Sequence, residues 1–172
     1  MSEATISTVD QLRQTFETAW LAFESFLAGL KPEDASKKDG AGWGVKDHVT
    51  HLAIWEESVA IVFRGGKRHE ALGIDEPFYQ QGSFDEINEV IKKREEHLTI
   101  DQSVERLRAV HHELKDELRA LSNADLLKTV REFFPTAPRT DDRPVVVFLY
   151  DNTAGHIVEH LPWMEALVSG SS

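Results

Sequence analysis

Residues 45–63 read Val45-Lys-Asp-His-Val-Thr-His-Leu-Ala-Ile-Trp-Glu-Glu-Ser-Val-Ala-Ile-Val-Phe63. Apolar side chains recur in this stretch at steps of three and four residues. They are Val45, Val49, Leu52, Trp55, Val59, Val62 and Phe63. This period matches the about 3.6 residues per turn of an α-helix. We therefore predict an amphipathic helix that starts near Val45 and ends at the pair Gly65 and Gly66.

The same period predicts further helices on both sides of this stretch. The predicted helices cover residues 9–30, 83–97, 104–121 and 144–161. Ser7 is the expected N-cap of the first helix, with Asp10 three residues later. Residues 83–121 are expected to form one long helix that is broken near Thr99. Residues 133–135 and 138–143, with Pro135 and Pro138, are expected to be irregular.

Two features complicate the last predicted helix. Residues 145–150 are Val-Val-Val-Phe-Leu-Tyr, a composition typical of a strand. No second strand exists for them to pair with, and helical spacing resumes directly afterwards, so we predict a helix here as well. Pro162 lacks the backbone donor that would bond to the carbonyl of Val158, and it is expected to kink or restart the helix.

Residues 65–82 form a long predicted connection with four glycines, Gly65, Gly66, Gly73 and Gly82, and with Pro77. Connections of this length are uncommon in a compact domain unless they line a binding site or cross between non-adjacent elements. The predicted fold class is therefore all-α, with a single domain over residues 1–172 and a long crossover.

Composition excludes several classes of function. The chain has 30 acidic and 19 basic side chains and a net charge of −11, from which we expect no nucleic-acid partner. It has no cysteine, which excludes disulfides, iron–sulfur clusters and thiolate zinc sites. The N-terminal residues show no basic leader, and no stretch is apolar for about 18 residues. We therefore expect a cytoplasmic protein with no membrane partner.

His156 and His160 form the most informative pair of polar residues. A spacing of four in a helix leaves two side chains about 40° apart around the axis, so both imidazoles share one face. Open metal sites commonly use three protein ligands, and His51 on the helix of residues 45–63 is the candidate for the third. His48, one turn earlier, is an alternative.

We predict no metal ligand among the four remaining histidines, and no catalytic role for Glu159, which lies between His156 and His160. His69, His97, His111 and His112 lie among polar or charged positions, where we expect solvated imidazoles. The string from His156 to His160 also matches the H-x-x-E-H pattern of some zinc peptidases. We reject that function because those enzymes take a further carboxylate from well downstream, and we expect Glu159 to face solvent or a neighbouring helix.

The segment Trp43-Gly-Val-Lys-Asp-His-Val-Thr-His51-Leu-Ala-Ile-Trp55-Glu56 resembles the W-[ST]-x-K-D-x-x-x-H-L-x-x-W-E helix of the DinB/YfiT-like superfamily of metalloenzymes. Residues 84–88, 103–121 and 152–160 resemble the corresponding parts of its ClbS/DfsB-like and maleylpyruvate-isomerase-like branches. The resemblance covers nearly the whole chain. One departure is Gly44, which stands where the family often has Ser or Thr.

The resemblance implies a four-helix bundle with a long crossover, a homodimer, and a divalent-metal site made of His51, His156 and His160 that opens into a pocket. ClbS/DfsB-like members often lack the complete triad, so its presence places this chain nearer the metal-binding branches. Other members use low-molecular-weight thiols, and the resemblance therefore implies such a thiol as cosubstrate.

Two functions follow as expectations. The first is a zinc- or nickel-dependent enzyme, a thiol-dependent transferase, isomerase or hydrolase that acts on a small molecule; no catalytic side chain is identified. The alternative is a non-catalytic small-molecule-binding or self-resistance protein of the ClbS/DfsB type, with Trp43, Trp55 and Trp163 lining its pocket. A DNA-damage-response interaction protein is a third option, suggested by the family name alone and opposed by the net charge.

Overall fold

The computed structural model describes residues 6–137 and 141–170. Both ends of the predicted domain and residues 138–140 of the predicted irregular segment lie outside this description. In chain order the elements are α1 (Val9–Ala28), η1 (Pro32–Ser36), α2 (Val45–Phe63), α3 (Arg68–Leu72), α4 (Glu76–Gln81), α5 (Phe84–Arg94), α6 (Ile100–Ala120), α7 (Asn123–Leu126), α8 (Val130–Phe133), α9 (Val145–Asp151) and α10 (Ala154–Ser169).

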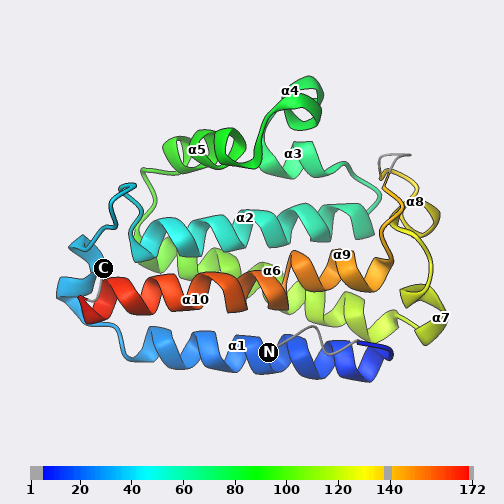
Figure 1. The fold of residues 1–172 in the computed structure, drawn as a ribbon, viewed down its shortest axis with the longest axis horizontal. Coiled ribbons are helices and arrows are strands. Elements are labelled where there is room, and N and C mark those ends of the chain that lie inside the picture. The colour runs from blue at the N-terminus through cyan, green and yellow to red at the C-terminus, as the bar shows by residue number, and fades with distance from the viewer. Residues whose placement is uncertain (1–5, 138–140, 171–172) are drawn as a thin grey trace.

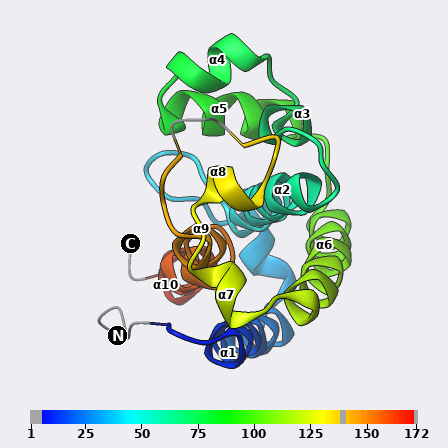
Figure 2. The same ribbon diagram turned by 90° about the vertical axis from the view of Figure 1, so that its right-hand side faces the viewer.

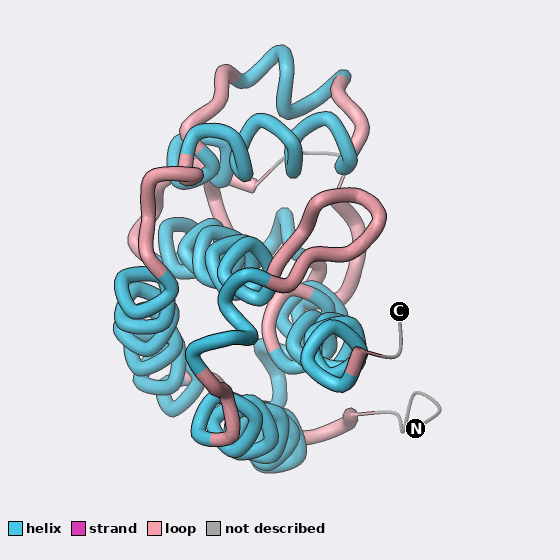
Figure 3. The backbone as a smooth tube through the Cα atoms, turned by 90° about the vertical axis from the view of Figure 1, so that its left-hand side faces the viewer, coloured by secondary structure: helices cyan, strands magenta, loops and turns pink. Residues whose placement is uncertain are grey.

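The described residues form helices and loops without a strand, apart from two isolated β-bridges (Figure 3). The all-helical prediction is confirmed, and residues 145–150 are helical despite their strand-like composition. The long helices α1, α2, α6 and α10 lie side by side, with α9 preceding α10 (Figures 1 and 2). None of the described helices is both long enough and apolar enough to cross a bilayer.

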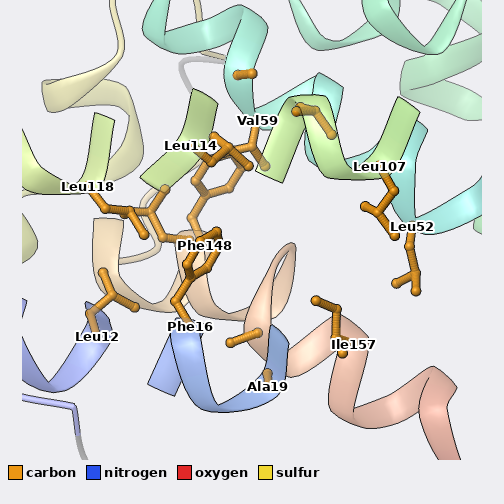
Figure 4. Close-up of a cluster of buried hydrophobic side chains, with 14 of the residues drawn as sticks. Leu12, Phe16, Ala19, Leu52, Val59, Leu107, Leu114, Leu118, Phe148 and Ile157 are labelled. Atoms are coloured by element: carbon orange, nitrogen blue, oxygen red, sulfur yellow. The ribbon is translucent and has the colours of Figure 1, made fainter. Parts of the chain in front are cut away.

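Helix α2 is enclosed on two sides. On its inner side it packs against α6 and α10, and on its outer side against α3 and α5. The main core lies on the inner side, where side chains from α1, α2, α6, α9 and α10 interdigitate (Figure 4). A second, smaller cluster lies on the outer side. It comprises Ile54, Trp55, Leu72, Ile87 and Ile91.

The crossover of residues 65–82 contains two short helices, α3 and α4, that sequence periodicity did not predict. Gly73 ends α3 with a φ of 64°, in the left-handed region that glycine adopts without strain. Leu72 is fully buried in the outer cluster, which anchors the crossover over α2. The crossover thus covers α2 and leads the chain to α5.

The helix starts are set by local caps. Thr8, not Ser7, is the N-cap of α1, and its partner in the capping box is Gln11. Ser83 and Thr99 begin α5 and α6 with capping boxes of their own, so the predicted long helix is two separate helices. The break near Thr99 was predicted correctly.

Gly44 at the start of α2 has a steric reason. A Cβ atom at this position would lie 2.9 Å from the carbonyl oxygen of Lys37, closer than normal contact allows. The backbone N–H of Gly44 donates to Oδ2 of Asp47 at 2.9 Å. The carboxylate of Asp47 therefore satisfies the helix start from inside α2, and the departure from the family pattern costs no contact of the histidines.

The prediction of a solvated His111 is wrong. His111 is 3% exposed, and its ring stacks between Phe16 and Trp20 at centroid distances of 3.9 and 3.8 Å. Its Nδ1 lies 3.3 Å from both carboxyl oxygens of Glu56, which is 1% exposed. Burial raises the pKa of Glu56, although the bond to His111 opposes this. The pair therefore joins α2 to α6 through buried ionisable groups.

We expect His111→Phe to destabilise the protein by about 3 kcal/mol, because it preserves the ring stacking but leaves the Glu56 carboxyl buried without a partner. The double variant Glu56→Leu/His111→Phe should return to within about 1 kcal/mol of the wild type, because no unpaired polar group is then buried. Urea unfolding of four proteins, the wild type, both single variants and the double variant, measures this. Simple additivity of the two substitutions would contradict the proposed coupling.

Candidate metal centre

Three histidines from two helices meet at one point. His51 lies on α2, and His156 and His160 lie one turn apart on α10. Their ring centroids form a nearly equilateral triangle with sides of 4.7, 4.6 and 4.7 Å. One nitrogen of each ring lies within 4.8 Å of those of the other two, and Nε2 of His51 is 2.9 Å from Nε2 of His156. The structure thus brings together the three residues that the sequence singled out.

The three imidazoles are uncharged at neutral pH. Burial, and then the neighbouring His156, His160 and His48, lowers the pKa of His51 well below its usual range. Burial, together with the smaller effect of the nearby Arg68, lowers the pKa of His156 to about 4. Burial also lowers the pKa of His160 far below its usual range, with His156 and His48 adding to the effect. Neutral rings keep a nitrogen lone pair available for a metal ion.

The donor set fits a divalent metal ion. Metal–nitrogen bonds of about 2.0–2.1 Å place two nitrogens of one tetrahedral ion roughly 3.3 Å apart, compared with 2.9 Å between the Nε2 atoms of His51 and His156. The buried Nδ1 atoms of His51 and His156 have no hydrogen-bond partner among the described residues. Burying a polar atom without a hydrogen bond costs free energy. Binding of a metal ion at the Nε2 atoms of the same rings would offset part of that cost.

His48 contacts the triad from the side. Its Nδ1 lies 2.9 Å from Nδ1 of His160, and its ring is 3% exposed. Burial lowers the pKa of His48, although Asp39 and Asp47 oppose this. The contact occupies Nδ1 of His160 and leaves Nε2 as the ligand atom of that ring. His48 therefore lies behind a member of the triad, a role that helical spacing alone did not distinguish from that of a ligand.

A cavity of about 750 Å³ opens beside the triad. The three histidines and His48 line it, together with four large aromatic side chains. The aromatic residues are Trp43, Trp55, Phe84 and Trp163. A further cavity of about 960 Å³ lies under the crossover and does not include the triad. The three tryptophans predicted as pocket residues do line the cavity, and Phe84 is an addition from the crossover side.

Arg68 is a residue near the site that the sequence did not indicate. Its Nη2 donates to Oδ1 of Asn152 at 2.6 Å and to Oγ of Ser58 at 2.8 Å. Its guanidinium also lies over the rings of Trp55 and Phe148, 5.2 and 5.0 Å from their centroids. This side chain ties the crossover to the start of α10. Its position depends on how α3 folds over α2, which no local pattern reveals.

The position of the histidine pair depends on a break in the last helix. α9 ends at Asp151 and α10 begins at Ala154, after Thr153 in a non-helical conformation. From there α10 runs to Ser169 with Pro162 inside it, so of the two predicted effects of Pro162, a kink or a restart, the restart does not occur. Gly155 lies where the chain turns into α10. A Cβ atom there would be 2.8 Å from Cε1 of Tyr150 and 3.0 Å from its carbonyl oxygen.

Comparison with known proteins supports the fold and the family. A family model described as the DinB superfamily matches residues 15–162. No curated protein sequence matches the chain. An uncharacterised protein from Escherichia coli UTI89 is 16% identical in sequence; the alignment covers 99% of this chain and 98% of that protein, with a TM-score of 0.72.

Two further solved structures share the fold. The colibactin self-resistance protein ClbS, in complex with a dsDNA, is 17% identical over 95% of this chain and 97% of its own, with a TM-score of 0.72. DfsB, described as a sibling lethal factor precursor, is 15% identical over 95% and 94%, with a TM-score of 0.68. At these identities the similarity establishes the fold.

The ClbS complex contradicts the expectation of no nucleic-acid partner, because it shows a protein of this fold together with double-stranded DNA. The expectation rested on the net charge of the whole chain. A binding surface responds to the local potential, which a sum over 172 residues does not describe. Net charge is therefore no basis for excluding this class of partner.

We expect Gly155→Ala to destabilise the protein by about 1–3 kcal/mol, because the added methyl group collides with Tyr150 at the start of α10. Gly40→Ala is the matched control, since a Cβ atom at Gly40 has no heavy atom within 4 Å. That variant should unfold within about 0.5 kcal/mol of the wild type. Chemical denaturation compares the two, and equal stability of both variants would contradict the steric argument.

Proposed function

This chain belongs to the DinB superfamily, and we propose that it is a small-molecule-binding protein of the ClbS/DfsB type that holds a divalent metal ion at His51, His156 and His160. The convergence of three imidazoles, two of them buried and that of His156 half-buried, at the wall of a 750 Å³ cavity carries this proposal. The likeness in fold to a self-resistance protein supports the binding role.

Zinc or nickel suits this donor set best. Imidazole is a good ligand for both ions, and the triad offers neither thiolates nor carboxylates. Three protein ligands would leave a coordination position facing the cavity, as in sites where a metal meets a substrate. A divalent ion held there would lower the pKa of a bound water to about 7 and would favour a bound thiolate in the same way.

The same arrangement supports a second candidate function. A metal with an open coordination position beside a cavity also suits a thiol-dependent transferase, isomerase or hydrolase that acts on a small molecule. The low-molecular-weight thiol would occupy the cavity beside the triad. The two candidates differ in what chelation does: an enzyme of this kind loses turnover, whereas a binding protein has no turnover to lose.

We expect protein purified without a histidine tag to contain about one zinc or nickel ion per chain, because the triad is buried, neutral and convergent. His156→Ala should lose the ion, since two imidazoles hold a divalent metal much more weakly than three. Elemental analysis by mass spectrometry measures both. His112→Ala, an exposed histidine on α6, is the control and should retain the metal. A metal-free wild type after incubation with zinc would refute the proposal.

We expect His48→Ala to weaken zinc affinity about 10–100-fold, because it removes the hydrogen-bond acceptor that would orient His160 from behind. His51→Ala should abolish measurable binding at the same zinc concentrations. Competition with a chromophoric chelator gives both affinities. A loss as complete in His48→Ala as in His51→Ala would show that His48 is itself a ligand.

A further inference from the structure

The cavity beside the triad is strongly acidic. Five of its lining residues carry carboxylates, and no lysine or arginine lines it among the described residues. The five acidic residues are Asp39, Asp85, Glu89, Asp151 and Glu159. They come from the loop before α2, from α5, and from α9 and α10, so separate segments of the chain contribute to the lining. Such a lining attracts cations and repels anions.

Two of these carboxylates have no partner within the protein. The side chains of Asp85 and Glu159 make no hydrogen bond and no ion pair with any residue that the structure describes. Glu89 lies 3.7 Å from Lys92, and Oδ1 of Asp39 accepts two backbone N–H groups of its own loop. The lining therefore keeps negative charge that internal ion pairs do not balance.

Two aromatic rings that line the cavity already contact basic side chains of the protein. Nζ of Lys92 lies 5.3 Å from the ring centroid of Trp43, and the guanidinium of Arg68 lies over Trp55. Trp163 and Phe84 have no such partner among the residues described, and they are 49% and 69% exposed. Glu159 lies one turn before Trp163 on α10, so a carboxylate and an indole share one face of that helix.

From this combination we infer that the cavity binds a small organic cation, an amine or a quaternary ammonium group, between the rings of Trp163 and Phe84 and the carboxylates of Glu159 and Asp85. Aromatic faces attract cations through their quadrupole, and recognition of quaternary ammonium groups commonly uses such walls. The inference rests on the proposed function, because it names the class of small molecule that the cavity takes.

The positive charges near the cavity leave this inference intact. A divalent ion at the neutral triad would add two charges and Lys92 beside Trp43 adds one, and the five carboxylates outnumber them. Arg68 does not line the cavity; it lies behind Trp55, where Asn152 and Ser58 hold its guanidinium. The cavity therefore stays negative with the triad loaded.

The test compares three probes of the same branched shape: choline, its neutral isostere with a tert-butyl group in place of the trimethylammonium, and the anion tert-butylacetate. Tryptophan fluorescence of the full chain at low ionic strength measures binding, once with chelator and once with zinc. We expect choline to bind about tenfold more tightly than the neutral isostere in both forms. Tert-butylacetate should bind more weakly than either.

Several outcomes would overturn the inference. Equal binding of the neutral isostere, preference for the anion, or no saturable binding of choline would each do so. A cation preference that zinc abolishes would also do so, because the carboxylates would then serve only to offset the metal. The metal content of the same preparation is measured separately, so failure of the cation test is distinct from failure of the proposed function.

A pair of matched double variants tests whether choline binds in this cavity. Asp85→Asn/Glu159→Gln removes two lining charges, and we expect it to weaken choline binding about tenfold. Asp101→Asn/Glu165→Gln removes the same charge from outside the cavity: Asp101 is also a first-turn acid of a helix, and Glu165 also lies on α10. The control should bind choline as the wild type does. Equal losses in both variants, or no loss in the first, would overturn the assignment to this cavity.

Discussion

The enclosure of α2 on two sides is the constraint on which the rest of the structure depends. Core residues cover its inner side and the crossover covers its outer side, so nearly every polar group on α2 must find a partner inside the protein. Some partners lie within α2 itself, such as the carbonyl oxygens of Lys46 and Trp55, and others come from neighbouring elements. Thr50 meets Ser103 of α6, and Ser58 meets Arg68 of α3. These contacts determine how the neighbouring helices sit on α2.

Enclosure also buries Glu56 and His51 of α2, and these two side chains find different kinds of partner. Glu56 pairs with His111 of α6, and neither residue lines the cavity. His51 meets imidazoles instead, and the buried Nδ1 atoms of His51 and His156 have no hydrogen-bond partner among the described residues. The helix thus carries two kinds of buried polar group. One kind pairs with a side chain of another helix, and the other converges with two imidazoles of α10 on a common point.

Sequence periodicity predicted the helices that bury a continuous stripe, and the spacing of His156 and His160 predicted a shared face. It failed where position depends on packing between distant segments. His111 has the spacing of Leu107, Leu114 and Leu118, so its burial could have been inferred from the stripe of α6. The break before α10 could not, because it depends on the ring of Tyr150 lying against Gly155. The acidic lining was equally hidden, since its members are far apart in sequence.

The net charge of the chain and the local charge around the cavity differ in what they reveal about binding. The net charge of −11 predicted that the protein has no nucleic-acid partner. A protein of the same fold in complex with DNA shows that net charge is a poor basis for that prediction. Resolved by position, part of the same charge lies around one cavity, beside exposed aromatic rings and above uncharged imidazoles. Since structures at 15–17% identity share this fold, the fold itself does not select a ligand. The side chains that line the cavity are therefore where this chain can differ in function from its relatives.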